Sequence, residues 1–210
     1  MPLNKTEWLL LSYMGMKKKY YLVLQGKKPG IYHTWAECQR QIKGYKGAQF
    51  KSYEDYNEAI AAQKSGLAQL DLESRIIGDS ISVDAACEGN PGKMEYRGVY
   101  TASKEQIFLQ GPYPNGTNNV GEFLALVHAL AMLKNKGRNT MVIYSDSKTA
   151  MAWVKAKKAK TTLLRNHQNE VLFQLIEKAE QWLQNNKYEN PILKWNTRAW
   201  GEIPADFGRK

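Results

Sequence analysis

The chain has 210 residues, enough for one medium domain and one small domain. Apolar residues make up 43%, too many for a disordered tail, and the spacing of the two cysteines suggests neither a disulfide framework nor a zinc site. Thirty basic residues against twenty acidic ones give a formal charge of +10, which favours a polyanionic partner such as nucleic acid.

The first part of the chain predicts a small basic module at residues 16–63. Strands are expected near 20–24, 31–32 and 48–53, with a Gly/Pro turn at 26–30. Thr34 and Glu37 have the spacing of a capping box, so a helix should start at Trp35 and run to about Lys43. A second helix is expected over 53–63. Residues 1–66 hold eleven basic and five acidic residues, so the positive charge is densest here.

Two segments flank this β-β-α-β-α module. Residues 1–15 precede the first strand and are expected to be a dispensable extension. Residues 64–79 show weak signals and are interpreted as a linker.

Residues 80–210 predict one α/β domain. Alternation over 81–85, a break at 89–92 and strands at 94–101 and 106–109 indicate an antiparallel meander. Apolar residues from 120 to 131 recur at helical spacing, and the short apolar run 141–145 is typical of a central parallel strand. Helices are expected over 147–155 and 162–184, a strand over 192–195, and a final short helix from Pro204.

Four acids stand at the ends of these elements: Asp84, Glu122, Asp146 and Asp206. Each has an ordinary interpretation. Asp84 could be a solvated strand residue, Asn119 and Glu122 could close a capping box, and Asp146 and Asp206 could cap helices. Taken together, the four acids have a second interpretation as one ligand site, because ligand sites in α/β sheets gather at the carboxyl ends of strands. Clustered carboxylates need a cation, and oxygen ligands without His or Cys select Mg²⁺ or Mn²⁺.

The segments around these acids resemble the signature blocks of type 1 ribonuclease H. The blocks are residues 83–92, 117–122, 144–147 and, at the tail, 200–206. The resemblance covers roughly residues 80–210, in the family's order and approximate spacing. It implies a ribonuclease H-like mixed five-stranded sheet flanked by helices, within an endonuclease that cuts the RNA strand of RNA–DNA hybrids.

The resemblance also implies a mechanism. Asp84, Glu122, Asp146 and Asp206 would hold two Mg²⁺ ions, with Mn²⁺ as an alternative, and cleavage would leave 5′-phosphate and 3′-hydroxyl ends. Glu202 stands where many bacterial members have a His. This matches a subset of the family in which the glutamate assists metal exchange and product release. A solvated loop acid is the alternative.

Further positions match the family's contacts with the hybrid. Glu88, Asn90 and Asn118 match residues that touch the minor groove, and Trp153 matches an aromatic residue of the DNA channel. Lys148 replaces an amide residue that contacts bases. The phosphate pocket for the DNA strand matches Thr117, Asn119, Thr161 and Thr162.

The first module resembles the small hybrid-binding domain that precedes this nuclease in eukaryotic and some bacterial members. The matching residues are Tyr21, residues 30–32, Thr34, Trp35, Cys38, Phe50 and Lys51. A core role is the alternative for Trp35 and Phe50, whereas their lysine neighbours favour stacking on nucleic acid.

We therefore expect an RNA–DNA hybrid as the partner of a cytoplasmic monomer with no membrane contact and no obligate protein partner. No apolar run approaches the ~20 residues of a membrane span. Two other functions remain open: a non-catalytic hybrid-binding protein, and another nuclease of this fold, such as an integrase-like enzyme.

Overall fold

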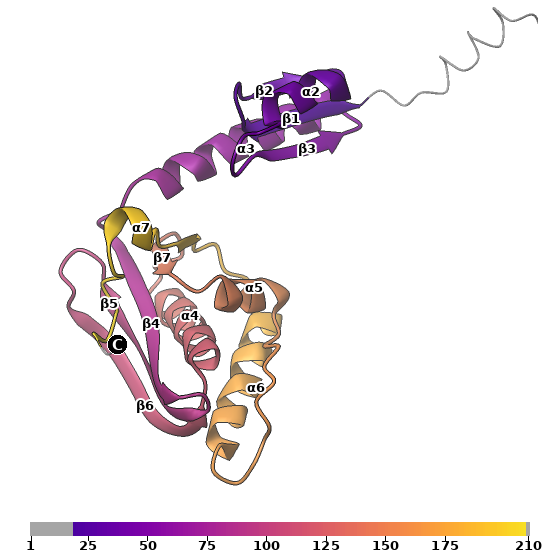
Figure 1. The fold of residues 1–210 in the computed structure, drawn as a ribbon. Coiled ribbons are helices and arrows are strands. Elements are labelled where there is room, and N and C mark those ends of the chain that lie inside the picture. Colours follow the sequence, from indigo (N-terminus) through magenta and orange to yellow (C-terminus); the bar gives the residue numbers. More distant parts are fainter. Residues whose placement is uncertain (1–18, 209–210) are drawn as a thin grey trace, which may run out of the picture. The chain divides into compact units, whose positions relative to one another are not determined.

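The computed structural model describes residues 19–208, with the backbone alone at 68–74, so the extension expected at 1–15 lies outside the described residues. The chain divides into two compact units between Arg75 and Ile76. Figure 1 shows both units in sequence colours, and each is described by itself.

The first unit is a three-stranded antiparallel sheet with two helices. Its strands are β1 (Tyr20–Gln25), β2 (Gly30–Tyr32) and β3 (Gln49–Tyr53), in the order β2-β1-β3. Helix α2 (Trp35–Ile42) begins with the predicted capping box of Thr34 and Glu37. The small core includes Leu22, Val23, Cys38 and Ala59.

Helix α3 (Tyr56–Ser74) is longer than the sequence indicated. The helix was expected to end at residue 63 and a linker to follow at 64–79. Because α3 continues to Ser74, most of that segment is helical. Gly66 explains the error. A Cβ there would lie 2.5 Å from Leu24 Cδ2, so this glycine allows α3 to pack closely on β1 and does not end the helix.

The second unit contains the mixed five-stranded sheet that the sequence predicted. Its order is β6-β5-β4-β7-β8, with β4–β5 and β5–β6 antiparallel and β4–β7 and β7–β8 parallel. The strands are β4 (Ser80–Gly89), β5 (Gly92–Tyr100), β6 (Gln106–Gly116), β7 (Val142–Ser145) and β8 (Ile192–Lys194).

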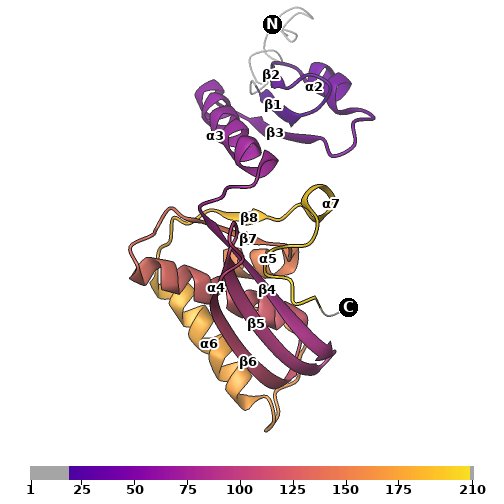
Figure 2. The ribbon, with the colours of Figure 1, turned by 90° about the vertical axis from the view of Figure 1, so that its left-hand side faces the viewer.

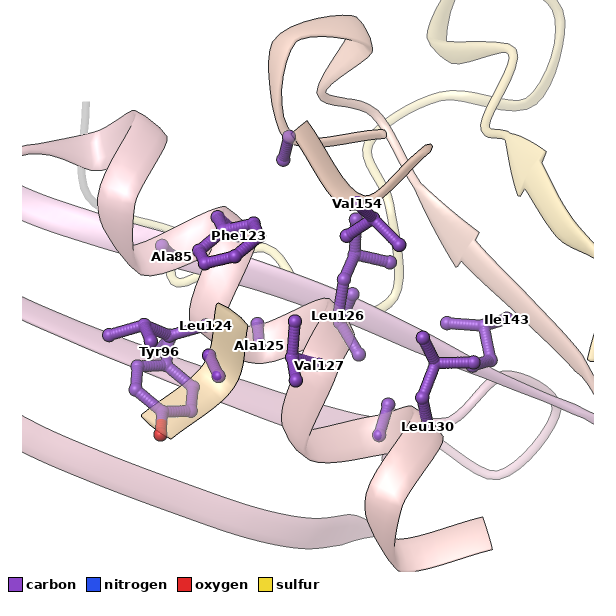
Figure 3. Packing of buried hydrophobic residues seen from close by; sticks show 14 of the residues in the cluster. Ala85, Tyr96, Phe123, Leu124, Ala125, Leu126, Val127, Leu130, Ile143 and Val154 are labelled. Atoms are coloured by element: carbon purple, nitrogen blue, oxygen red, sulfur yellow. The ribbon is translucent and has the colours of Figure 1, made fainter. Parts of the chain in front are cut away.

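Three helices pack together beside this sheet: α4 (Asn118–Asn135), α5 (Lys148–Ala156) and α6 (Glu170–Asn185). Helix α4 lies against β4 and β5 and also contacts α5 and α6 (Figure 2). Figure 3 shows its apolar side chains meeting Ala85 and Tyr96 of the sheet, Ile143 of β7 and Val154 of α5. Helix α4 is therefore central to the core and is held on several sides.

Two helix predictions in this unit were wrong. Helix α6 starts at Glu170 instead of residue 162, because Asn166 and Asn169 hydrogen-bond each other's backbone in a turn just before it. The last helix, α7 (Thr197–Trp200), ends before Pro204, and no helix follows among the residues described up to 208. Within residues 19–208, no helix has the length and apolarity needed to cross a membrane.

Candidate metal centre

Three acids from different elements meet in the second unit. Carboxylate oxygens of Asp84 on β4, Glu122 on α4 and Asp146, directly after β7, all lie within 4.8 Å of one another. Among the described side chains, no other group of three or more potential metal ligands is this compact. The predicted convergence of these three residues is therefore present in the fold.

The pairing of β4 with β7 leaves space beside Asp84 for the other acids. Strand β7 pairs with β4 only at residues 80–82, so β4 continues past it without a neighbour on that side. Val83 and Ala85 belong to the core beneath α4. Asp84 alternates to the opposite side of the strand, where the end of β7 leaves room for it.

Glu122 is placed by a close contact between helix and sheet. A Cβ on the preceding Gly121 would lie 2.6 Å from both Ala85 Cβ and Met94 Sδ, so only glycine allows this approach. The helix starts at the Thr117 cap, and Asn118 Nδ2 donates to Glu122 Oε1 at 3.2 Å. The capping box of Asn119 and Glu122 is thus not formed.

Asp146 does not cap α5. Ser147 is the N-cap, and its hydroxyl accepts a hydrogen bond from the Ala150 N–H at 3.1 Å. The Asp146 carboxylate therefore remains available to the cluster, against the alternative that the sequence left open.

Burial and mutual repulsion oppose full ionisation of the cluster. Burial, and next the charge of Asp146, raise the pKa of Asp84 to about 8. Burial is also the largest cause that raises the pKa of Glu122 to about 7, although Ser147 and Lys194 act in the opposite direction. The pKa of Asp146 is raised by burial, against the attraction of Lys194. A bound cation would relieve this penalty.

Asp206 and Glu202 lie beside the cluster but outside the group of three. Both line one open cavity of about 350 Å³ together with Asp84, Glu88, Asn118, Glu122 and Asp146. Glu202 is exposed and Asp206 half-buried. The structure thus brings all five predicted acids to one cavity, and their roles remain predictions.

The residues expected to contact the hybrid surround this cavity in part. Glu88 and Asn118 line it, Asn90 lies in the turn after β4, and Asn119 and Lys148 lie at the starts of α4 and α5; all five are exposed. Thr161 and Thr162 lie in the loop before α6. This loop is tied down by buried Glu180, which accepts from the Ala159 N–H at 2.9 Å and pairs with Lys158.

Trp153 differs from the expectation of an aromatic surface in a DNA channel. It is only 8% exposed and meets Phe123 edge to face within the core. Its packing accounts for most of its surface, so any nucleic-acid contact would use the remaining edge. His128 also packs internally, stacked on Phe108 with ring centroids 4.0 Å apart.

The first unit carries a continuous aromatic surface. The Trp35 ring lies 5.6 Å from Tyr21 and 5.7 Å from Phe50, measured between centroids. Trp35 is 44% exposed and Phe50 47%, so neither is a core residue. Lys51 is also exposed and lies over the Tyr53 ring. We call Tyr21, Trp35 and Phe50 the aromatic face.

Sequence reasoning missed two basic residues of the second unit. Lys194 on β8 pairs in register with Ser145, and its charge partly offsets the rise in the pKa values of Glu122 and Asp146. Arg97 on β5 lies directly opposite Asp84. The turn at residues 89–92 was a usable signal, because a tight hairpin there sets that pairing.

Two family models match the chain. One, described as the ribonuclease H1 N-terminal domain, covers residues 19–63, and the other, described as RNase H, covers residues 79–193. A ribonuclease H of Aromatoleum aromaticum is 30% identical over 106 residues, which cover 47% of this chain and 68% of that protein.

Other relatives match shorter stretches. A ribonuclease H of Crithidia fasciculata is 38% identical over 78 residues, or 37% of this chain and 16% of that protein, and one of Schizosaccharomyces pombe is 44% identical over 45 residues, or 21% and 17%. The chain thus spans less than a fifth of these two relatives. The solved RNase H1 of Halobacterium salinarum has 20% identity and a TM-score of 0.38, over 59% of this chain and 89% of that one.

Proposed function

The chain belongs to the ribonuclease H family, and on that premise we propose that it is an endonuclease that hydrolyses the RNA strand of RNA–DNA hybrids, leaving 5′-phosphate and 3′-hydroxyl ends. The observation that carries the proposal is the buried cluster of Asp84, Glu122 and Asp146, whose carboxylate oxygens lie within 4.8 Å of one another.

The cluster could hold a divalent metal ion, and the proposal assigns it two Mg²⁺ ions. All its ligand atoms are hard oxygens, which suit Mg²⁺ or Mn²⁺ better than a softer metal. Burial, and next to it the charge of neighbouring Asp146, raise the pKa values of Asp84 and Glu122, and a bound cation would favour their ionised forms. Asp84, Glu122 and Asp146 would hold the ions, and Asp206 would complete the set.

Bound Mg²⁺ would supply Lewis-acid activation of water and charge neutralisation at the departing 3′ oxygen. The protein's own contribution is to keep the carboxylates fixed on β4, α4 and the end of β7, so that little reorganisation is needed during reaction. Asn118 orients the Glu122 carboxylate through its 3.2 Å hydrogen bond. Exposed Glu202 is suited to assisting metal exchange and product release at the cavity mouth.

Hybrid recognition would use three sets of residues. Glu88, Asn90 and Asn118 would meet the minor groove, where 2′-hydroxyls distinguish RNA from DNA. Lys148 and the edge of Trp153 would face the DNA strand. A phosphate of the DNA strand would bind Thr117, Asn119, Thr161 and Thr162. The first unit would add affinity through the aromatic face and Lys51, since stacking on exposed rings tolerates any base.

The proposal is tested with labelled RNA–DNA hybrid, duplex DNA and duplex RNA, each with Mg²⁺ and with EDTA. We expect cleavage of the hybrid's RNA strand with Mg²⁺ only, and end-group analysis should find 5′-phosphates. Hybrid binding without cleavage would instead identify a non-catalytic binding protein. Cutting of duplex DNA would indicate an integrase-like nuclease. Cytoplasmic location and a monomeric state remain predictions.

A further inference from the structure

Asp206 is the one proposed metal ligand that neither lies on nor directly follows a helix or strand. Asp84 and Glu122 are on a strand and a helix, and Asp146 directly follows a strand. Asp206 lies in the irregular segment after α7, and it stands outside the compact group of three. Its carboxylate can therefore join that group only if the backbone of this segment is fixed on the sheet.

Arg97 makes the contacts that fix this backbone. Its Nε donates to the carbonyl oxygen of Ala205 at 2.8 Å, and its Nη2 donates to the carbonyl oxygen of Asp206. The guanidinium also lies over the Phe207 ring, 4.6 Å from the centroid. One side chain thus holds three consecutive residues.

The register of β5 explains why Arg97 can reach them. Arg97 is directly opposite Asp84 in the antiparallel pair, so both side chains leave the sheet on the same side. The burial of Ile203 and Ala205, which are 2% and 0% exposed, adds apolar anchoring just before Asp206. The chain also turns back on itself here, because the Gly208 N–H donates to Asp206 Oδ2 at 2.8 Å.

We infer that Arg97 is a positioning residue, which sets the placement of the Asp206 carboxylate at the metal centre by clamping the backbone of residues 205–207 to β5. It touches neither substrate nor metal. The inference rests on the proposed function, because it gives Asp206 the role of a metal ligand. Its chemistry is that of an outer-shell partner, whose loss typically weakens metal affinity or activity by about 10–100-fold.

The test compares Arg97→Met, Arg97→Lys, Asp206→Asn and the double variant Arg97→Met/Asp206→Asn with the full-length wild type. Methionine keeps an unbranched stem about as long as the arginine chain up to Nε and removes every donor, while lysine retains the charge and offers a single ammonium in place of the planar guanidinium. Arg138→Met is the matched control, because Arg138 pairs with exposed Asp79 at 3.0 Å, away from the cavity. Readouts are Mn²⁺ affinity by calorimetry without substrate, the Mg²⁺ dependence of cleavage, and KM for the hybrid.

We expect Arg97→Met to weaken Mn²⁺ binding and to raise the Mg²⁺ concentration for half-maximal cleavage, each about tenfold. KM for the hybrid should change by less than about twofold, because ground-state binding of substrate is untouched. Arg97→Lys should lie between Arg97→Met and wild type, and Arg138→Met should equal wild type. In the Asp206→Asn background, Arg97→Met should weaken Mn²⁺ binding no further, since its effect passes through Asp206.

An equal loss of Mn²⁺ affinity in both backgrounds would overturn the inference, as would an unchanged metal dependence in Arg97→Met. If Arg97→Met does not fold, Arg97→Lys decides by the same metal measurements, with wild-type metal dependence counting against the inference. Should Asp206→Asn retain wild-type cleavage and Mn²⁺ affinity, the proposed role of Asp206 fails whatever Arg97 does. The two failures are therefore distinguishable.

Discussion

Replacing Asp84 by asparagine should stabilise the folded protein when no divalent cation is present, and the gain should grow with pH. The pKa of Asp84 is raised from 3.8 to about 8, chiefly by burial and next by Asp146. A tenfold change in an acid constant corresponds to about 1.4 kcal/mol, so this displacement amounts to roughly 6 kcal/mol for an isolated site. Asparagine has the same shape and no charge to bury.

The sign follows from proton linkage. Because the folded-state pKa lies above the unfolded-state value, the folded protein binds more protons between pH 3.8 and about 8. The contribution of Asp84 to stability is therefore fully present below pH 3.8 and is lost as the pH rises through about 8. At pH 4 the variant and wild type should unfold alike, and at pH 9 the variant should be more stable by about 2–5 kcal/mol, given that the acids share the repulsion.

The assay is urea unfolding in EDTA at pH 4, 7 and 9, with hydrogen exchange of β4 and α4 to report on the second unit alone. Asp79→Asn is the control, because this carboxylate is 78% exposed and its ion pair should be worth less than about 1 kcal/mol. Added Mg²⁺ should stabilise wild type more than the variant and close the gap. A gap in EDTA that is absent, or that does not widen with pH, would refute the argument that the cluster needs a cation.

Three other substitutions test the rest of the structure. Asp146→Asn should abolish cleavage. Hybrid affinity, measured by gel shift, should stay near the wild-type value, because the phosphate-contacting surfaces are unchanged. Turnover like that of wild type would exclude a catalytic role for Asp146. The double variant Trp35→Ala/Phe50→Ala should lose roughly 1–3 kcal/mol of hybrid affinity per ring. The dependence of affinity on salt concentration should not change, because net charge is preserved. Unchanged affinity would show that the aromatic face does not bind hybrid. Gly121→Ala should reduce the free energy of unfolding by about 1–3 kcal/mol, because its Cβ would overlap Ala85 and Met94 and push α4 from the sheet; Gly78→Ala, with no atom within 4 Å of its Cβ, is the control.

The centre of the second unit was largely predictable from local pattern. Alternation placed Asp84 on a strand, and the apolar run before Asp146 placed that acid at a strand end, as the sheet has them. Those signals work because side-chain period and element ends are properties of short segments. The individual strands follow from the same signals, whereas their assembly into one mixed five-stranded sheet was implied by the family resemblance.

The errors lie where distant residues decide the local structure. Gly66 was interpreted as part of a linker, but its missing side chain makes room for Leu24 of β1. Pro204 was expected to open a helix, but the carbonyl oxygens of Ala205 and Asp206 accept hydrogen bonds from Arg97 instead. Neither partner is near in sequence, so no window of local sequence contains the cause.

The order of the acids along the chain has a consequence for synthesis. Residues 20–74, which form the three-stranded sheet and its helices, leave the ribosome well before Asp206. At about 5–20 residues per second, the delay is on the order of ten seconds. A nascent chain therefore acquires its aromatic surface first and its complete set of acids last. Under the proposed function, the unit assigned to hybrid binding is therefore synthesised before the nuclease is complete, and a chain truncated after β8 would carry the aromatic face but lack Asp206.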